Sequence, residues 1–304
     1  MSTSLQPKPR TDEAPRAYPL SNTSAVETNR LDYQHAVFTI RTRGLNRASF
    51  SKSPCRVLDL GCGTGIWTRQ FAAKHPDSTV LGVDLNLALA DETDENKLPQ
   101  NCSFITADIE KEWEFSSQSD YIYMRMIMIA VKDWPALLRR TFANLNPGGQ
   151  VEVFDGLMHL TADDGSTAAN SAAIHWFELS KEYLAKHDIA WDLSRNLPEQ
   201  MIKAGFEVIE SETIKMRLYP DSRDPEADRD WVAANYRKDI SDIVHGMTKR
   251  MRTDLASRML PEEWDTLEQN TKREILEESE QRGFHTTLYV RVARKPELGL
   301  NLKL

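Results

Sequence analysis

Cysteine, long apolar runs and clustered basic charge are all scarce in this sequence of 304 residues. Its three cysteines, Cys55, Cys62 and Cys102, are an odd number without the spacing of metal ligands. We therefore expect no metal site, no disulfide framework and a reducing compartment. The longest apolar run, from Met126 to Val131, is far too short to span a bilayer.

Acidic residues outnumber basic ones, because 46 Asp and Glu stand against 38 Lys and Arg and leave a net charge of -8. Proteins that bind the phosphate backbone of nucleic acids rely on clustered Lys and Arg, and no such cluster is evident. We expect no nucleic-acid or membrane partner, and a small-molecule or protein partner instead. The expected location is the cytoplasm, with the nucleus as the alternative.

Proline is concentrated at the start of the chain, between Pro7 and Pro19, among Ser, Thr and charged residues. This composition predicts a disordered leader over residues 1–24. The apolar content of 40% and the charged content of 28% are those of an ordinary globular protein. We expect one folded domain over residues 25–296, followed by a short tail over residues 297–304.

A short strand that runs into a glycine loop organises the chain. Residues 57–60 are mostly apolar and form the kind of run that is buried in a parallel sheet. Gly61, Gly63 and Gly65 then let the backbone turn tightly and approach a ligand closely. Apolar residues recur at helical spacing from Ile66, so the loop is expected to end at the N-terminus of a helix.

The spacing Gly-x-Gly-x-Gly is not that of a dinucleotide fingerprint, which places its third glycine where Ile66 stands. Asp59 lies two positions before the loop, where a pyrophosphate would meet its negative charge. A cofactor with an ammonium group and a sulfonium would be attracted instead. Asp84 ends the next strand, about 20 residues further on, the distance at which an acid meets ribose hydroxyls. A tight turn without a ligand is the alternative.

The segment Asp59-Leu-Gly-Cys-Gly-Thr-Gly65, with Asp84 after it, resembles motifs I and II of the class I S-adenosylmethionine-dependent methyltransferases. The resemblance implies S-adenosyl-L-methionine as the cofactor, bound by Asp59, Gly61, Cys62, Gly63, Gly65, Asp84 and Leu85. Asp108 and Ile109, at the end of the third strand, stand where this fold places an acid against the adenine amine. Asp108 could equally be a helix cap.

Two further segments resemble the fungal LaeA-like (UMTA-like) methyltransferases. One is Glu-x-x-Arg-Leu-x-x-Gln-His over residues 27–35, in a predicted helix before the first strand. The other runs from Arg-Met to Asp-Trp-Pro over residues 125–135 and is followed by Leu-Asn-Pro-Gly-Gly. The resemblance implies that Gln34, His35, Met124 and Arg125 lie beside the cofactor. Gln34 and His35 lie on the same predicted helix face as Leu31 and Phe38, where a buried pair with its hydrogen bonds satisfied within the protein is the more frequent case.

Strand and helix patterns alternate through five strands up to Asp155, and two further strands are predicted from Phe206 and from Phe284. Together with the resemblance, this order predicts an α/β fold with a Rossmann-like, seven-stranded, doubly wound sheet whose last strand is antiparallel. Helical insertions that cap the site are expected at about residues 25–45, 160–195 and 226–282. The insertion around Trp176 is rich in aromatic residues, which could be core packing or the wall of a pocket for an apolar substrate.

Methyl transfer from a sulfonium needs a nucleophile held about 3 Å from the methyl group, and a general base is optional. The candidate catalytic residues are His159 and His175, with Asp155 as a pocket residue at the end of the fifth strand. We expect a methyltransferase that acts on a small molecule of fungal secondary metabolism. The alternatives are a LaeA-like regulatory protein with weak or no turnover, and a cofactor-binding enzyme that does not transfer methyl groups.

Overall fold

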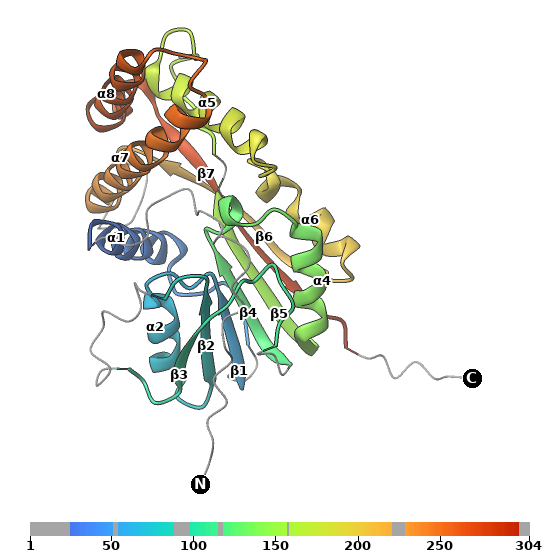
Figure 1. Ribbon diagram of the computed structural model, residues 1–304. Coiled ribbons are helices and arrows are strands. Elements are labelled where there is room, and N and C mark those ends of the chain that lie inside the picture. The colour runs from blue at the N-terminus through green and yellow to red at the C-terminus, as the bar shows by residue number, and fades with distance from the viewer. Residues whose placement is uncertain are drawn as a thin grey trace.

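The computed structural model describes residues 25–50, 54–87, 98–114, 118–156, 158–220 and 229–297. The expected leader over residues 1–24 and all but the first residue of the expected tail lie outside this part of the chain. Seven strands form one sheet in the order β3-β2-β1-β4-β5-β7-β6 (Figure 1). They are β1 (Arg56–Leu60), β2 (Thr79–Asp84), β3 (Cys102–Thr106), β4 (Ser119–Arg125), β5 (Leu145–Gly156), β6 (Glu207–Arg217) and β7 (His285–Arg294).

The five strands from β3 to β5 pair in parallel, with β1 at their centre between β2 and β4. β7 pairs antiparallel with β5 on one side and with β6 on the other. The strand order reverses between β1 and β4, and at such a point a crevice opens beyond the carboxyl ends of the strands. The predicted seven-stranded, doubly wound sheet with an antiparallel last strand is confirmed.

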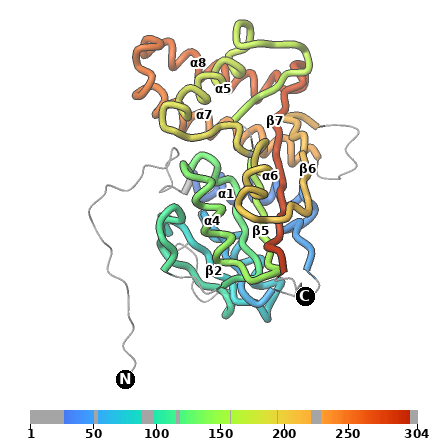
Figure 2. Tube along the Cα trace, turned by 90° about the vertical axis from the view of Figure 1, so that its right-hand side faces the viewer, coloured from blue at the N-terminus to red at the C-terminus, as the bar shows by residue number. Residues whose placement is uncertain are grey.

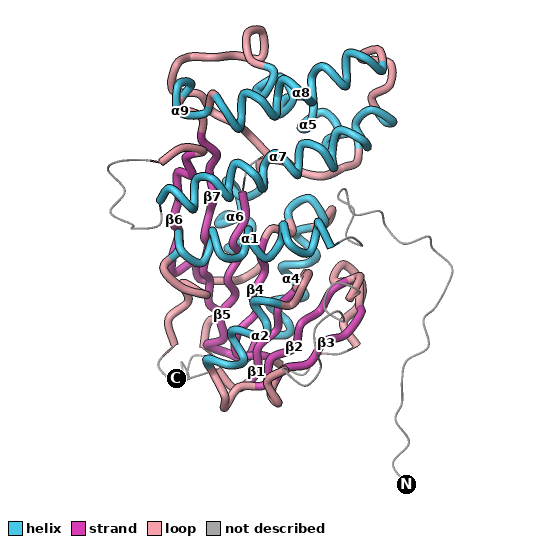
Figure 3. Tube along the Cα trace, turned by 90° about the vertical axis from the view of Figure 1, so that its left-hand side faces the viewer, coloured by secondary structure: helices cyan, strands magenta, loops and turns pink. Residues whose placement is uncertain are grey.

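Helices cover both faces of the sheet and one of its ends. They are α1 (Ala25–Thr42), α2 (Ile66–Lys74), α4 (Trp134–Asn144), α5 (Ala172–Lys186), α6 (Leu193–Lys203), α7 (Arg229–Asp254), α8 (Pro261–Glu277) and α9 (Ser279–Arg282), with a short 3-10 helix, η2 (Met128–Ala130). In Figures 1 and 2, α5, α7 and α8 gather beyond one end of the sheet. Figure 3 shows α1 running beside α7. None of the helices in the described ranges is long and apolar enough to cross a membrane.

Alternation along β1 places its side chains in two different cores. Leu58 and Leu60 pack in a core with α4 and α6 on one face of the sheet. Val57 packs on the other face with Trp67 of α2. Asp59 follows Val57 at the strand period of two, so its carboxyl group lies on the α2 side of the sheet.

A third core holds the helices beyond the sheet together. Trp176 of α5 and Trp264 of α8 are both almost fully buried in it. The Trp176 Nε1–H donates to the Thr248 Oγ1 of α7 at 2.8 Å. Core packing, one of the two interpretations of the aromatic insertion, therefore applies to Trp176.

Local contacts set the start of two elements. α5 begins at Ala172, because Ser171 is extended and its Oγ accepts a hydrogen bond from the Ile174 N–H at 3.2 Å. β5 begins at Leu145, so that the Asn-Pro-Gly-Gly segment lies within it. The sheet accommodates that segment as an irregularity in the pairing of β4 with β5.

A buried ion cluster joins α1 to α7. The Arg30 Nη1–H donates to Asp239 Oδ1 at 2.6 Å, and the Gln34 Nε2–H donates to Asp239 Oδ2 at 3.0 Å. Arg30 also donates to both carboxylate oxygens of Glu27, at 2.8 and 2.7 Å. All four side chains are almost fully buried. Burial raises the pKa of Asp239 and the charge of Arg30 opposes the rise, so Arg30 helps to keep the carboxylate ionised.

The Asp239→Asn variant keeps the shape of this side chain and removes its charge. We expect it to lower the free energy of unfolding by about 2 kcal/mol, within the range for a hydrogen bond to a charged group. Urea denaturation followed by circular dichroism measures the change. Asp242→Asn is the matched control, because Asp242 pairs with the exposed Lys238 of the same helix, where a pair contributes about 0–1 kcal/mol. Equal losses in the two variants would contradict a stabilising role of the buried cluster.

Candidate active site

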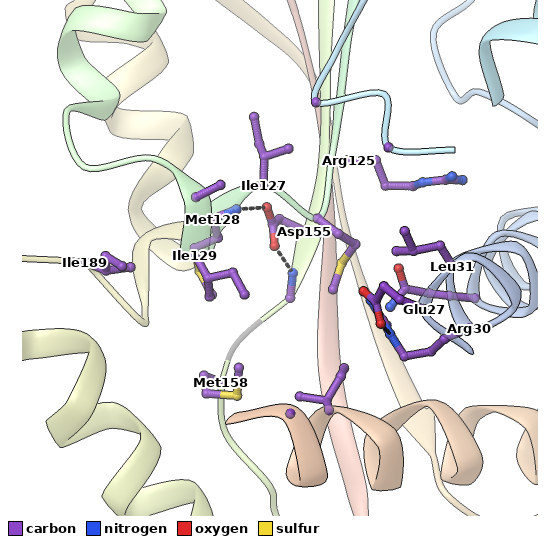
Figure 4. A pocket seen from close by; sticks show the side chains of 18 of the residues that line it. Glu27, Arg30, Leu31, Arg125, Ile127, Met128, Ile129, Asp155, Met158 and Ile189 are labelled. Atoms are coloured by element: carbon purple, nitrogen blue, oxygen red, sulfur yellow. Dashed lines mark hydrogen bonds and ion pairs between the residues drawn. The ribbon is translucent and has the colours of Figure 1, made fainter. Parts of the chain in front are cut away.

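One large cavity lies where β1, β4 and β5 end, with a volume of about 1580 Å³. Typical small-molecule sites occupy roughly 300–1,000 Å³, so this cavity has room for two small molecules. It begins at the glycine loop and extends to the C-terminal half of α7. Figure 4 shows its middle, where Asp155 lies between Met128 on one side and Arg30 and Leu31 of α1 on the other.

The glycine loop packs so closely against its neighbours that larger residues would not fit. Gly61 and Gly65 have φ values of +76° and +70°, in the region that favours glycine. A Cβ at Gly61 would lie 2.5 Å from Cγ2 of Ile127, and one at Gly65 would lie 2.5 Å from Cε1 of Phe104. The Gly61 N–H donates to the Val83 carbonyl at 2.8 Å. The backbone of the loop is therefore held directly against its neighbours.

Asp84 fastens the loop to the end of β2. Its Oδ2 accepts a hydrogen bond from the Gly63 N–H at 2.8 Å, and its Oδ1 accepts one from the Asn86 N–H at 3.0 Å. Burial raises the pKa of Asp84, and these N–H groups oppose the rise. A carboxylate has about four acceptor positions, so Asp84 can also accept from a ligand in the cavity that it lines.

Asp59 lines the same end of the cavity although its residue surface is only 3% exposed. Its Oδ2 accepts a hydrogen bond from the Thr68 hydroxyl at 2.6 Å, while its Oδ1 makes none within the described residues. Burial raises the pKa of Asp59 to about 7, and Thr68 and the charge of Arg125 oppose the rise. A cation bound beside Asp59 would favour the ionised form.

Arg125 ends β4 and lines the cavity, with His35 behind it. Its Nη1 is 2.9 Å from the Nδ1 of His35, whose Nε2 is 3.0 Å from the Oε1 of Gln70. A guanidinium only donates, so Nδ1 accepts and Nε2 carries the proton that is donated to Gln70. Burial and the charge of Arg125 lower the pKa of His35 to about 4, so its imidazole is neutral at pH 7.

Asp155 fixes the turn between β4 and η2. Its Oδ2 accepts a hydrogen bond from the Met128 N–H at 2.7 Å, and its Oδ1 accepts one from the Gly156 N–H at 2.8 Å. Burial raises the pKa of Asp155 to about 7. The turn also contains Met126 in the left-handed conformation, with a φ of 53°. Such a conformation costs energy in a non-glycine residue and persists where the surrounding structure holds it in place.

Beyond Asp155 the cavity is lined mainly by apolar side chains, and we name this part the apolar chamber. Its residues are Ile127, Met128, Ile129, Met158, Phe177, Tyr183, Ile189, Tyr236, Ile240 and Ile243. They come from η2 and its approach, from the connection after β5, and from α5 and α7. The second interpretation of the aromatic insertion, a pocket wall, therefore applies to Phe177 and Tyr183.

The cofactor residues expected from the sequence fall into two groups. Those that line the cavity are Gln34, Asp59, Gly61, Cys62, Gly63, Asp84, Leu85, Asp108, Ile109 and Arg125. His35, Gly65 and Met124 lie behind that surface, since Gly65 caps α2 and Met124 is fully buried in the sheet. Asp108 also accepts a hydrogen bond from the Glu110 N–H at 2.9 Å, so it stabilises a turn as well as lining the cavity.

The structure does not bring His159 or His175 to the cavity. Met158 lines it, but the Nδ1 of the next residue, His159, lies 2.8 Å from the Nζ of Lys181 on α5. An ammonium group only donates, so this Nδ1 accepts, and burial lowers the pKa of His159. His175 lies on α5, half-buried and outside the lining. Of the three catalytic candidates, Asp155 alone lines the cavity.

Sequence reasoning expected caps over the site at about residues 25–45 and 226–282, but, Gln34 apart, it did not identify which residues of α1 and α7 form the cavity wall. Glu27, Arg30 and Leu31 of α1 line the cavity. The spacing of Glu27 and Arg30, at i and i+3, is a local signal that they pair. Asp239, the other partner of Arg30, lies 209 residues further along the chain, and no local pattern connects the two.

The class of protein follows from where the acids lie. Asp59 and Asp84 flank a loop without the third dinucleotide glycine, at the switch point of a doubly wound sheet. This arrangement is that of the class I S-adenosylmethionine-dependent methyltransferases. The family model described as "Methyltransferase domain" matches residues 33–211 of the chain.

Curated relatives and a solved structure agree with this class. Methyltransferase cpsF of Aspergillus campestris is 33% identical over 233 residues, which cover 74% of this chain and 78% of that protein. Protein-methionine methyltransferase laeA of Emericella nidulans is 34% identical over 228 residues, which cover 73% of this chain and 58% of that protein. Phosphoethanolamine N-methyltransferase 2 of Haemonchus contortus, solved with S-adenosyl-L-methionine, shares the fold with a TM-score of 0.51 and 20% identity, over 90% of this chain and 58% of that one. The chain belongs to the methyltransferase family, and its relatives include both cpsF and laeA.

Comparison of alanine variants at Gly61 and Gly165 separates the energetic cost of overpacking from the cost of backbone strain. Gly61→Ala combines a left-handed φ with the clash against Ile127, whereas Gly165 has a φ of +80° and nothing within 4 Å of an added Cβ. We expect Gly165→Ala to lower the free energy of unfolding by about 1 kcal/mol, the cost of left-handed alanine. Gly61→Ala should cost a further 1–3 kcal/mol or so, the usual range for overpacking. Urea denaturation of both variants checks this, and equal costs would show that the contact with Ile127 relaxes easily.

Proposed function

We propose that the protein transfers the methyl group of S-adenosyl-L-methionine to a small molecule that binds in the apolar chamber. The observation that carries this proposal is the continuity of one cavity from the glycine loop to α7. Its volume of about 1580 Å³ leaves room for an acceptor beside the cofactor. The same cavity therefore lets the two molecules meet without intervening protein.

The residues at the glycine-loop end fit the cofactor group by group. Asp59 would attract the ammonium of its methionine part, and the guanidinium of Arg125 would pair with the carboxylate. Asp84 would accept hydrogen bonds from the ribose hydroxyls, while Asp108 and Ile109 would lie at the adenine. The backbone of Gly61, Cys62 and Gly63 provides the close approach that a larger loop residue would block. Three expected cofactor residues lie behind the cavity surface and would not contact the cofactor. Gly65 would shape the loop, Met124 would support the strand beside it, and His35 would orient Arg125.

The reaction is an in-line displacement. A lone pair of the acceptor attacks the methyl carbon, and the bond from that carbon to the sulfonium breaks with its electron pair going to sulfur. Holding the two reactants about 3 Å apart supplies most of the acceleration. An acceptor that is a phenol or a protonated amine must also lose a proton to a base or to water. Asp155, whose pKa burial raises to about 7, is the candidate base that lines the cavity, but both of its oxygens already accept backbone N–H groups.

The names of the relatives support an acceptor from fungal secondary metabolism. The alternative is regulation, because relatives such as laeA of Monascus pilosus are named secondary metabolism regulators, and this chain spans 53% of that protein. The apolar chamber favours a small acceptor, since buried side chains of α5 and α7 form part of its walls. We propose a cytoplasmic location for such an enzyme and a nuclear one for a regulator.

Calorimetry and mass spectrometry test these alternatives together. Titration with S-adenosyl-L-methionine should show binding to the wild-type chain, and its failure would contradict the shared premise. Incubation with a fungal metabolite extract should then yield a metabolite heavier by one CH₂ group, together with S-adenosylhomocysteine. A rearranged product without consumption of the cofactor would instead identify a non-methylating enzyme. Binding without any product would favour the regulatory function.

The pKa of Asp59 predicts how cofactor affinity depends on pH. Because this pKa is raised to about 7, the carboxyl group is mostly neutral in mildly acidic solution and becomes an anion as the pH rises. We expect affinity for S-adenosyl-L-methionine to rise about tenfold between about pH 6 and pH 8, as the carboxylate forms and attracts the ammonium. In Asp59→Asn the affinity at the higher pH should fall by a similar factor, and most of its pH dependence should vanish.

Glu152→Gln is the control for this measurement. Burial raises the pKa of Glu152 to about 7 as well, but Glu152 bonds to Tyr121 and to backbone N–H groups and does not line the cavity. Its variant should keep the pH dependence of the wild type. If Asp59→Asn binds the cofactor as tightly as the wild type, the ammonium partner has been wrongly assigned.

A further inference from the structure

The part of the cavity that the C-terminal half of α7 lines is at the far end from the glycine loop, and α1 forms part of the wall between the two ends (Figure 1). Gly246, Lys249, Arg250 and Thr253 of α7 line it at helical spacing and so share one face of the helix. Gly246 has no side chain, so the wall at that position is backbone. Two cations, Lys249 and Arg250, therefore stand beside the mainly apolar chamber, and the lining at this end also includes Asp254 and two histidines, His187 and His245.

Lys249 and Arg250 have no partner of opposite charge among the described residues. Within the described ranges, neither side chain makes a hydrogen bond or an ion pair, and Lys249 is exposed. Arg237 of the same helix also lacks a carboxylate in this part of the chain, but its Nη1–H donates to the Leu218 carbonyl at 3.1 Å. Lys238 and Arg252 of the same helix are paired with carboxylates at 2.7 and 3.0 Å. Arg250 is half-buried, so its charge is only partly solvated. A half-buried guanidinium without a carboxylate is expected to attract an anion.

Asp254 lines the same end of the cavity, and Asp254 and Glu268 are each paired with a histidine. The Oδ2 of Asp254 lies 2.7 Å from the Nε2 of His187, and the Oε1 of Glu268 lies 2.8 Å from the Nδ1 of His245. The hydroxyl of Tyr183, which lines the chamber, is influenced by the charges of both Asp254 and Arg250. Burial raises the pKa of the Tyr183 hydroxyl, Asp254 adds to the rise, and Arg250 opposes it. Arg250 is thus close enough to act on a group that lines the chamber.

We propose that Lys249 and Arg250 bind the carboxylate of an elongated apolar acid, whose body fills the apolar chamber. The placement of its nucleophile beside the methyl donor rests on the proposed function, whereas the carboxylate site does not. The planar guanidinium of Arg250 matches a carboxylate with two parallel hydrogen bonds, and Lys249 adds a point charge. The isoleucine and methionine side chains between the two ends contact the apolar body and give no polar partner to it. The site therefore selects acids over their neutral analogues.

Calorimetry with a matched pair of probes tests this site. Dodecanoate and its uncharged methyl ester are titrated separately into the full chain saturated with S-adenosylhomocysteine. We expect dodecanoate to bind about tenfold more tightly than the ester, the effect of one charge-assisted hydrogen bond. Arg250→Gln should remove most of this preference and Lys249→Gln part of it, while the affinity for S-adenosylhomocysteine stays unchanged. Arg250→Lys keeps the charge and should retain part of the preference.

The controls remove the same charges elsewhere on α7. Lys238→Gln and Arg252→Gln match the two test variants in residue type, and neither residue lines the cavity. They should leave the preference for dodecanoate unchanged. Equal affinity of the wild type for the acid and the ester would overturn the proposal, and so would an equal loss in the control variants. If S-adenosylhomocysteine does not bind, the proposed function fails, but the same titrations without it still test the carboxylate site.

Discussion

The contact between Gly61 and Ile127 is the constraint on which both halves of the cavity depend. A Cβ at Gly61 would lie 2.5 Å from Ile127, so the loop can approach that side chain only as glycine. Ile127 is also a wall of the apolar chamber, immediately before η2. The same contact therefore positions the loop for the methyl donor and the wall for the acceptor. Asp155 reinforces it by holding the Met128 N–H at 2.7 Å.

The charged side chains in the wall of this cavity are of two kinds, those neutralised by a partner within the protein and those that are not. Arg30 reaches the cavity from α1 because Glu27 and Asp239 neutralise it within hydrogen-bond distance. Removal of one partner of such a buried pair is more costly than the pair is stabilising, so α1 and α7 are constrained to stay together. Arg125 is arranged differently, since a neutral imidazole holds it and leaves its positive charge uncompensated on that side. The positive charge of Arg125 therefore remains available to a ligand.

The sequence predicts those features that depend on local patterns. The strand, loop and two acids of residues 57–84 follow from strand period, glycine spacing and charge, and the sheet follows from the order of the elements. Side-chain direction was not predictable in the same way. Met158 faces the cavity while His159 faces Lys181, and this choice depends on α5, which folds over the sheet later in the chain. The position of His35 behind Arg125 also required the tertiary structure, because the helix pattern shows only which face is buried.

The antiparallel last strand has a consequence for how the molecule is made. β7 follows α7 and α8 in the chain, yet it lies inside the sheet between β5 and β6. During synthesis, the edge of β5 stays without its neighbour until both helices have left the ribosome. An unpaired strand edge is a template for aggregation. The helices over the apolar chamber are thus part of the folding path of the sheet itself, and a slow-folding variant of them would prolong the exposure of β5.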